Sequence, residues 1–136
     1  MGQQQLLLIV LGVIIVGIAV VVGINLFNAN AEESTKDTLV SEGTNLGAMA
    51  QQYFKKPVAL GGGGNDFTGF GTAPSAGNPG QLLPANLTDT PTADWAISGA
   101  GATSVTITGT PKLTDYGWTV VVTVTPTAIN ALVSGS

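Results

Sequence analysis

The side chains that most often do chemistry in proteins are scarce in this 136-residue chain. It contains no histidine, no cysteine and no arginine, and its eight acidic residues are not paired in apolar surroundings. It also lacks the glycine loop with which nucleotide-binding enzymes hold phosphates. General acid–base, nucleophilic and metal-assisted catalysis need such groups in close arrangement. We therefore expect no enzymatic activity and no cofactor.

Calcium binding is the one metal chemistry that the sequence raises. Residues 61–69, GGGGNDFTG, nearly fit a calcium-binding nonapeptide, but Thr68 stands where that motif has a large apolar residue. A single copy also lacks the stacked neighbours that complete such a site. The remaining candidate ligands are aspartates whose spacing singles out no site: Asp66, Asp89, Asp94 and Asp115. We therefore expect no metal site, and the glycine run predicts a flexible connection.

Two further features concern partners and modification. Four lysines face eight acidic residues, for a net charge of -4, whereas nucleic-acid binding needs a basic patch. No nucleic-acid partner is expected. Asn86-Leu87-Thr88 matches the N-glycosylation sequon, which makes Asn86 a candidate glycosylation site if it lies outside the cell.

The elements that position these groups begin with a long apolar run. Residues 6–27 read LLLIVLGVIIVGIAVVVGINLF, with Asn25 as the single polar side chain, and the first charged residue is Glu32. As a helix this run is roughly 33 Å long, enough to span a bilayer. No basic residue precedes it, which disfavours a cleaved secretory signal. Because the flank that follows is net acidic, we expect the N-terminus inside and the rest of the chain exported.

The helical pattern continues beyond the apolar run. Residues 31–56 contain no proline and carry an apolar stripe at Leu39, Leu46, Met49, Ala50 and Tyr53. Polar side chains between these positions, Glu42 and Gln51 among them, are expected to face water. Lysines followed by Pro57 suit a helix end. The pattern predicts one helix over 1–56, with an apolar part at 1–30 and an amphipathic part at 31–56.

The rest of the chain changes character twice. Residues 57–93 are rich in glycine and proline and predict an irregular loop, whereas residues 94–136 alternate between apolar and polar side chains. The alternating apolar positions are Trp95, Ile97, Val105, Ile107, Trp118, Val120, Val122 and Val124. This period of two predicts an antiparallel head of three to four strands. The apolar face of the sheet and the stripe of the helix should cover each other, giving an α+β fold.

This layout resembles the type IV pilin family, in which a long N-terminal helix with a hydrophobic first half carries a sheet on its second half. Laid on the family's N-terminal pattern, Met1 takes the first position, Gln5 takes the position of a glutamate, and Leu6, Leu7 and Leu8 open the apolar run. A second register remains open, because prepilin peptidase cuts after glycine: cleavage after Gly2 would make Gln3 the mature start.

The resemblance implies a role for Gln5. In the family, the glutamate at this position neutralises the N-terminal amine of a neighbouring subunit inside the filament core. Gln5 is uncharged and easier to bury, and its amide oxygen can still accept a hydrogen bond from an ammonium group. We expect Gln5 to keep a weaker form of this docking role.

The resemblance also implies a function. The chain is expected to be the structural subunit of an extracellular filament that is a homopolymer. Its precursors would form a membrane-inserted pool, be cleaved by a prepilin peptidase and be added to the filament by an assembly machinery. Gly12, Gly17 and Gly23 would let neighbouring helices approach closely. Two alternatives stay open: a pseudopilin of the type II secretion kind, which forms only short assemblies, and a single-pass anchor for an exported domain.

Overall fold

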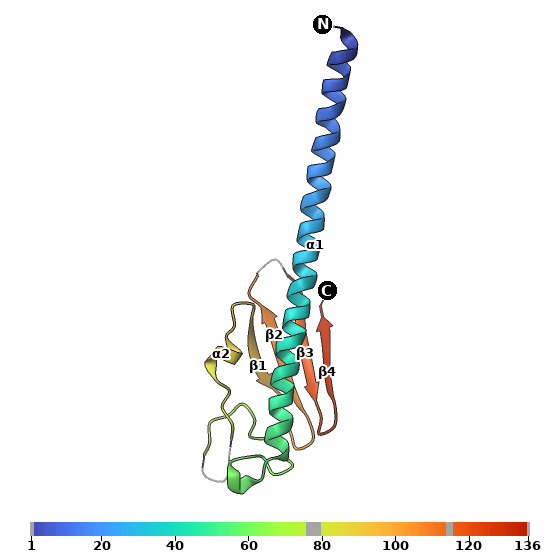
Figure 1. Cartoon of the computed structure of the whole chain (residues 1–136). Helices are drawn as coiled ribbons and strands as arrows, with labels where there is room; N and C mark the ends of the chain where they lie inside the picture. The colour runs from blue at the N-terminus through green and yellow to red at the C-terminus, as the bar shows by residue number, and fades with distance from the viewer. Residues whose placement is uncertain (1, 76–79, 114–115, 136) are drawn as a thin grey trace. The chain divides into compact units, whose positions relative to one another are not determined.

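The structure is a computed structural model that describes residues 2–75, 80–113 and 116–135. It confirms the α+β class, with one long N-terminal helix packed on a four-stranded antiparallel sheet (Figure 1). The chain divides into two compact units, Met1–Ser34 and Thr35–Ser136. The elements are α1 (Gln3–Lys55), the 3₁₀ helix η1 (Val58–Leu60), α2 (Ala85–Thr88), β1 (Ala93–Ser98), β2 (Val105–Pro111), β3 (Thr119–Val124) and β4 (Ile129–Ser134).

The second half of α1 supplies the helical side of the core. Leu39, Leu46, Ala50 and Tyr53 are at most 1% exposed, as the apolar stripe predicts, and Met49 is half-buried against them. The helix ends at Lys55, two residues before Pro57. A proline disfavours helical backbone in the residue before it, and Lys55 places a positive charge near the negative end of the helix dipole.

The sheet is a simple meander whose strands follow chain order, β1-β2-β3-β4. Along β2 and β3 the residues on one side are buried: Val105, Ile107, Val120, Val122 and Val124 are fully inaccessible. They face the apolar stripe of α1, which crosses this side of the sheet (Figure 1). The predicted alternation is thereby confirmed. The fourth strand, β4, has a weaker pattern, because Ile129, Ala131 and Val133 on its inner side are only half-buried.

The segment between helix and sheet is anchored by large apolar side chains. Phe67, Phe70 and Leu83 are buried in the same core as α1 and the strands. The ring of Phe67 stacks on that of Phe54 with centroids 4.6 Å apart. Phe70 pairs with Gln81 in an isolated parallel bridge. This segment therefore folds against the helix although its sequence has no regular period.

The glycine run after η1 is bonded to the end of α1. The backbone N–H groups of Gly63, Gly64 and Asn65 donate to the carbonyls of Tyr53, Lys56 and Phe54, respectively, at 2.7–3.0 Å. These carbonyls have no partner within the helix, because the last turn of any helix leaves them free. A Cβ on Gly63 would meet the Asp66 carbonyl oxygen at 1.9 Å. The run predicted as a flexible connection thus caps the helix, and close approach of the backbone requires its glycine.

Candidate assembly surface

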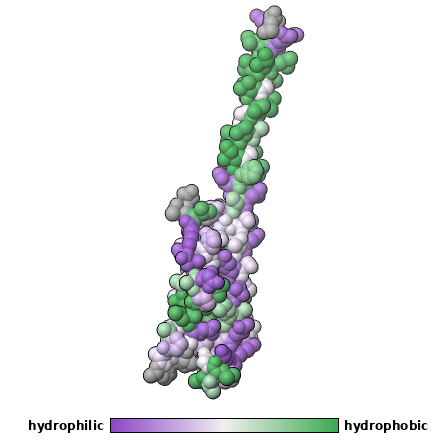
Figure 2. Space-filling view, turned by 60° about the vertical axis from the view of Figure 1, so that its left-hand side comes forward, coloured by the Kyte–Doolittle hydropathy of each residue, from purple (hydrophilic) through white to green (hydrophobic). Residues whose placement is uncertain are grey.

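The apolar first part of α1 is uncovered. Each of its large hydrophobic side chains from Leu6 to Phe27 is at least 50% exposed. Figure 2 shows hydrophobic surface along this part of the helix on the face in view. Its length and apolar composition are those of a helix that can cross a bilayer, with a mean hydropathy of 3.3 over the apolar window. A surface of this kind in water would be unfavourable, so the helix needs lipid or other helices around it.

The described residues that are expected to take part in assembly lie on this helix. Leu6, Leu7 and Leu8 are 62–67% exposed, and Gln5 is exposed in the first turns, with its backbone N–H donating to the Gly2 carbonyl at 3.2 Å. Met1 lies outside the described residues. Gln5 is the last of three consecutive glutamines that precede the apolar run.

The three glycines in the apolar part of α1, Gly12, Gly17 and Gly23, do not share one side. At about 100° per residue, Gly12 and Gly23 lie within about 20° of each other around the axis, and Gln5 is on the same side. Gly17 is about 140° away from Gly12 by the same geometry. A Cβ added at any of the three glycines would meet no atom within 4 Å. Contacts within the chain therefore do not require glycine at these positions.

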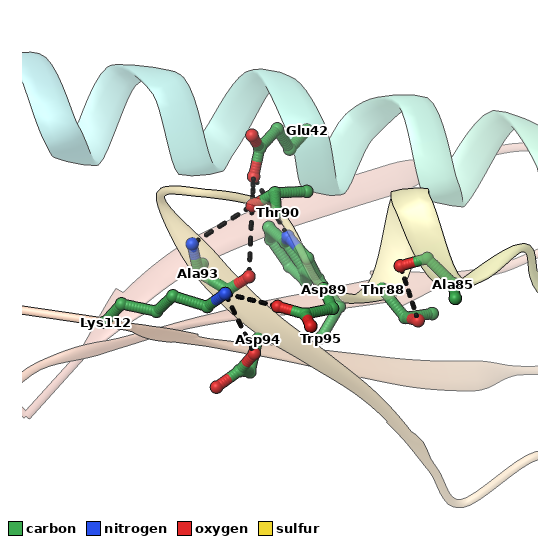
Figure 3. A network of polar contacts seen from close by, with 9 residues as sticks. All are labelled: Glu42, Ala85, Thr88, Asp89, Thr90, Ala93, Asp94, Trp95 and Lys112. Atoms are coloured by element: carbon green, nitrogen blue, oxygen red, sulfur yellow. Dashed lines mark hydrogen bonds and ion pairs between the residues drawn. The ribbon is translucent and has the colours of Figure 1, made fainter.

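A polar cluster in the globular unit joins α1 to β1. The Glu42 carboxylate, on the helix, accepts hydrogen bonds from the indole nitrogen of Trp95 at 3.0 Å and from the Thr90 hydroxyl at 3.2 Å (Figure 3). That hydroxyl also accepts from the backbone N–H of Ala93 at 3.0 Å. Trp95 is 6% exposed, so Glu42 supplies an acceptor to an indole N–H group of a buried side chain. The cluster fixes the helix against the edge of the sheet.

Two polar side chains of α1 therefore differ from the prediction that they face water. Glu42 is half-buried in the cluster just described, and Gln51 is half-buried with its amide nitrogen donating to the Thr125 carbonyl at 3.0 Å. Helical periodicity places both beside the apolar stripe but says nothing about partners on the strands. Trp95 could have indicated this role of Glu42 from the sequence, since a buried indole N–H usually has a hydrogen-bond acceptor.

The aspartates considered for calcium are already engaged. Lys112 forms ion pairs with Asp89 and, at 3.7 Å, with Asp94. Its hydrogen bond and positive charge lower the pKa of Asp89. The Asp66 carboxylate accepts from the backbone N–H of Thr68 at 2.8 Å and from the Thr68 hydroxyl, and these bonds lower the pKa of Asp66. Asp115 lies outside the described residues, and among the described ones no cluster of three metal-binding side chains forms.

The sequon residue Asn86 lies in the short helix α2. Its side chain is exposed, whereas Thr88 is half-buried with its hydroxyl donating to the Ala85 carbonyl at 3.4 Å. Asn86 is thus accessible to modification if the globular unit is exported.

Comparison of this chain with protein-family models, curated proteins and solved structures gave no match. Its function has to be argued from its own residues.

Proposed function

We propose that this chain is the structural subunit of an extracellular helical filament of the type IV pilus kind, assembled through the apolar part of α1. The observation that carries the proposal is that residues 6–27 are uncovered and apolar while the same helix continues into residues that form the core of the globular unit. In the proposed polymer, the apolar part of α1 would pack in the filament core, and the continuation of the helix would hold the globular unit at the filament surface.

The energetics favour close helix packing as the source of assembly. Apolar side chains that leave a bilayer exchange lipid for protein, so the gain of roughly 25 cal/mol per Å² for leaving water does not apply. Packing contacts must replace it. Gly12 and Gly23, whose Cβ positions are open on one side of the helix, allow two helix backbones to come close.

The proposal includes a membrane-inserted precursor pool, processing by a prepilin peptidase and export of the globular unit to the cell surface. The partner of the chain is itself, and its role is structural rather than catalytic. The type II secretion pseudopilin alternative shares all of these features and differs in the length of the assembly. The single-pass anchor alternative differs more, because an anchor does not need its helix to run on into the core of the exported unit.

Negative-stain microscopy of surface material sheared from producing cells tests the proposal. Long fibres that contain the chain are expected, with the unassembled remainder in the membrane fraction. A variant that lacks residues 1–27 should be soluble and monomeric. Fibres of native diameter from that truncated variant would show that the helix is not the assembly element. Membrane-bound chain without any fibres would favour the anchor alternative.

A further inference from the structure

The sheet has a second face, on the side opposite α1. The helix occupies the first face closely: a Cβ on Gly43 would meet Val122 Cγ2 at 2.6 Å, and one on Gly47 would meet Ile129 Cγ2 at 2.9 Å. Val122 and Ile129 are strand residues whose side chains point toward the helix. Because side chains alternate along a strand, the residues next to them in each strand point away from the helix. We call this side the outer face. Its residues are exposed or half-buried.

The strand register arranges the outer face in rows. Ala96 pairs with Thr108, Thr108 with Val121, and Val121 with Leu132, so these four form a row across the whole sheet. The row presents methyl groups, and Leu132 in it is 63% exposed. On one side of this middle row the register aligns four polar residues, Ser98, Thr106, Thr123 and Asn130. The other side carries Thr110, Thr119 and Ser134, with Asp94 at the corner.

The outer face is almost free of charge. Asp94 is the one charged residue in the sequences of the four strands, and it lies at the edge of the sheet within 3.7 Å of Lys112. The other charged residues that the structure describes are in α1 or in the loops. Exposed protein surface usually carries charges of both signs at a quarter or more of its positions. Two copies of this acidic chain can therefore bring their outer faces together without opposing like charges.

A face of hydroxyl groups beside methyl groups is also complementary to itself. Each serine or threonine hydroxyl can both donate and accept a hydrogen bond, whereas carboxylates can only accept and ammonium groups can only donate. We propose that the outer face binds the outer face of a second copy of this chain, with the two middle rows in contact. Stacked sheets pack about 10 Å apart, a spacing that side chains of this size fill.

The area of the face limits the strength of one such contact. Four strands about 4.8 Å apart and five residues long at about 3.4 Å each cover roughly 300–400 Å² per copy. A standard stable interface buries about 800 Å² per partner. One pair is thus too small for a stable dimer, but repeated contacts along two assemblies reinforce each other. In filaments, these repeated contacts would make neighbouring filaments associate side by side. This lateral association rests on the proposed function, whereas the contact between two single chains does not.

Cross-linking can detect the pairwise contact, because the chain contains no cysteine. We would place one cysteine in the middle row with Val121→Cys and a matched one on the exposed side of α1 with Gln52→Cys. The full chain, in detergent micelles, is treated with a short bis-maleimide, and dimers are counted on a denaturing gel. Val121→Cys should give several-fold more dimer than Gln52→Cys. Adding Thr108→Lys to Val121→Cys should reduce the dimer to the level of Gln52→Cys.

The filament arm uses Thr108→Lys alone, with Thr127→Lys in the turn before β4 as a control of equal charge. Parent and Thr127→Lys filaments should form bundles, and Thr108→Lys filaments should stay single. Equal dimer yields from Val121→Cys and Gln52→Cys would overturn the proposal, as would binding of a neutral polysaccharide to the face without any dimer. Specific dimers in a chain that makes no filaments would uphold the contact and reject the proposed function.

Discussion

The carboxylate of Glu42 and the indole nitrogen of Trp95 are 53 positions apart in the sequence and 3.0 Å apart in space. Their hydrogen bond joins the helix to the first strand at the edge of the sheet (Figure 3). Trp95 also lies between two glycines: a Cβ on Gly43 would meet its ring at 2.8 Å and one on Gly109 would meet it at 2.6 Å. The indole thus occupies a narrow slot between the helix and β2, which exists because Gly43 and Gly109 have no side chains.

Removal of the Glu42 carboxylate should destabilise the globular unit. In Glu42→Ala the Trp95 N–H stays buried without an acceptor, which costs on the order of 1–3 kcal/mol. Glu42→Gln keeps an amide oxygen in reach and should lose less. Urea unfolding of the full chain in micelles, followed by tryptophan fluorescence, measures the difference. Glu33→Ala, at an exposed helix position, serves as the control. An unchanged unfolding midpoint for Glu42→Ala would contradict the importance of this hydrogen bond.

Closure of the tryptophan slot should be destabilising as well. Gly109 is paired across the strands with Trp95, so the methyl group of Gly109→Ala would overlap the indole ring. Overpacking of this kind costs typically about 1–3 kcal/mol. The same unfolding measurement applies, with Gly101→Ala as the control because its nearest atom to an added Cβ is 3.7 Å away. If both substitutions had the same small effect, the slot would tolerate an added methyl group.

Gln5 provides the prediction that bears most directly on assembly. If its amide accepts a hydrogen bond from a neighbour's N-terminal amine, Gln5→Leu leaves that amine with one partner fewer, at a cost on the order of 1–3 kcal/mol per contact. The yield of sheared filaments should fall while the membrane-inserted monomer stays at parental levels. Gln5→Glu should be tolerated, since a carboxylate can pair with the amine. Parental filament yield from Gln5→Leu would favour the register in which the mature chain starts at Gln3.

The ion pairs of Lys112 predict a small pH dependence. The pKa of Asp89 is lowered by Lys112, so its contribution to stability is present above the ordinary aspartate pKa and is lost as the pH falls through the lowered value. In Lys112→Gln, carboxyl NMR titration should show the Asp89 pKa returning towards its ordinary value. Asp66, whose pKa is lowered by bonds to Thr68, should titrate as in the parent. An Asp89 pKa that did not change would mean that Lys112 is not its partner in solution.

Local periodicity explains which features could be predicted. The apolar run and the stripe of Leu39, Leu46 and Tyr53 repeat at helical spacing, and Val120, Val122 and Val124 repeat at strand spacing. These patterns reflect the burial of one face of each helix or strand. Because the buried residues recur at regular spacing within one element, the pattern is visible in the sequence of that element alone. The long helix, the antiparallel sheet and their mutual packing were therefore readable from residues close together in the sequence.

The path of the backbone explains what was missed at the end of α1. The glycine run after α1 was predicted to be flexible because its composition has no period, yet its N–H groups bond to the Tyr53, Phe54 and Lys56 carbonyls. Which donors reach the free carbonyls of a helix end depends on the path of the backbone, which composition does not specify.

By itself, the sequence determined that this protein has a long helix, apolar in its first part, and a β-rich unit whose side chains alternate between apolar and polar. The tertiary structure alone decided that Glu42 is a partner of Trp95 rather than a solvent-facing acid, and that Gly43 and Gly109 hold the indole between them. The physical reason is that hydrophobic burial is an average over one element and leaves a periodic trace, whereas a hydrogen bond or a steric slot needs particular atoms from distant segments at particular distances.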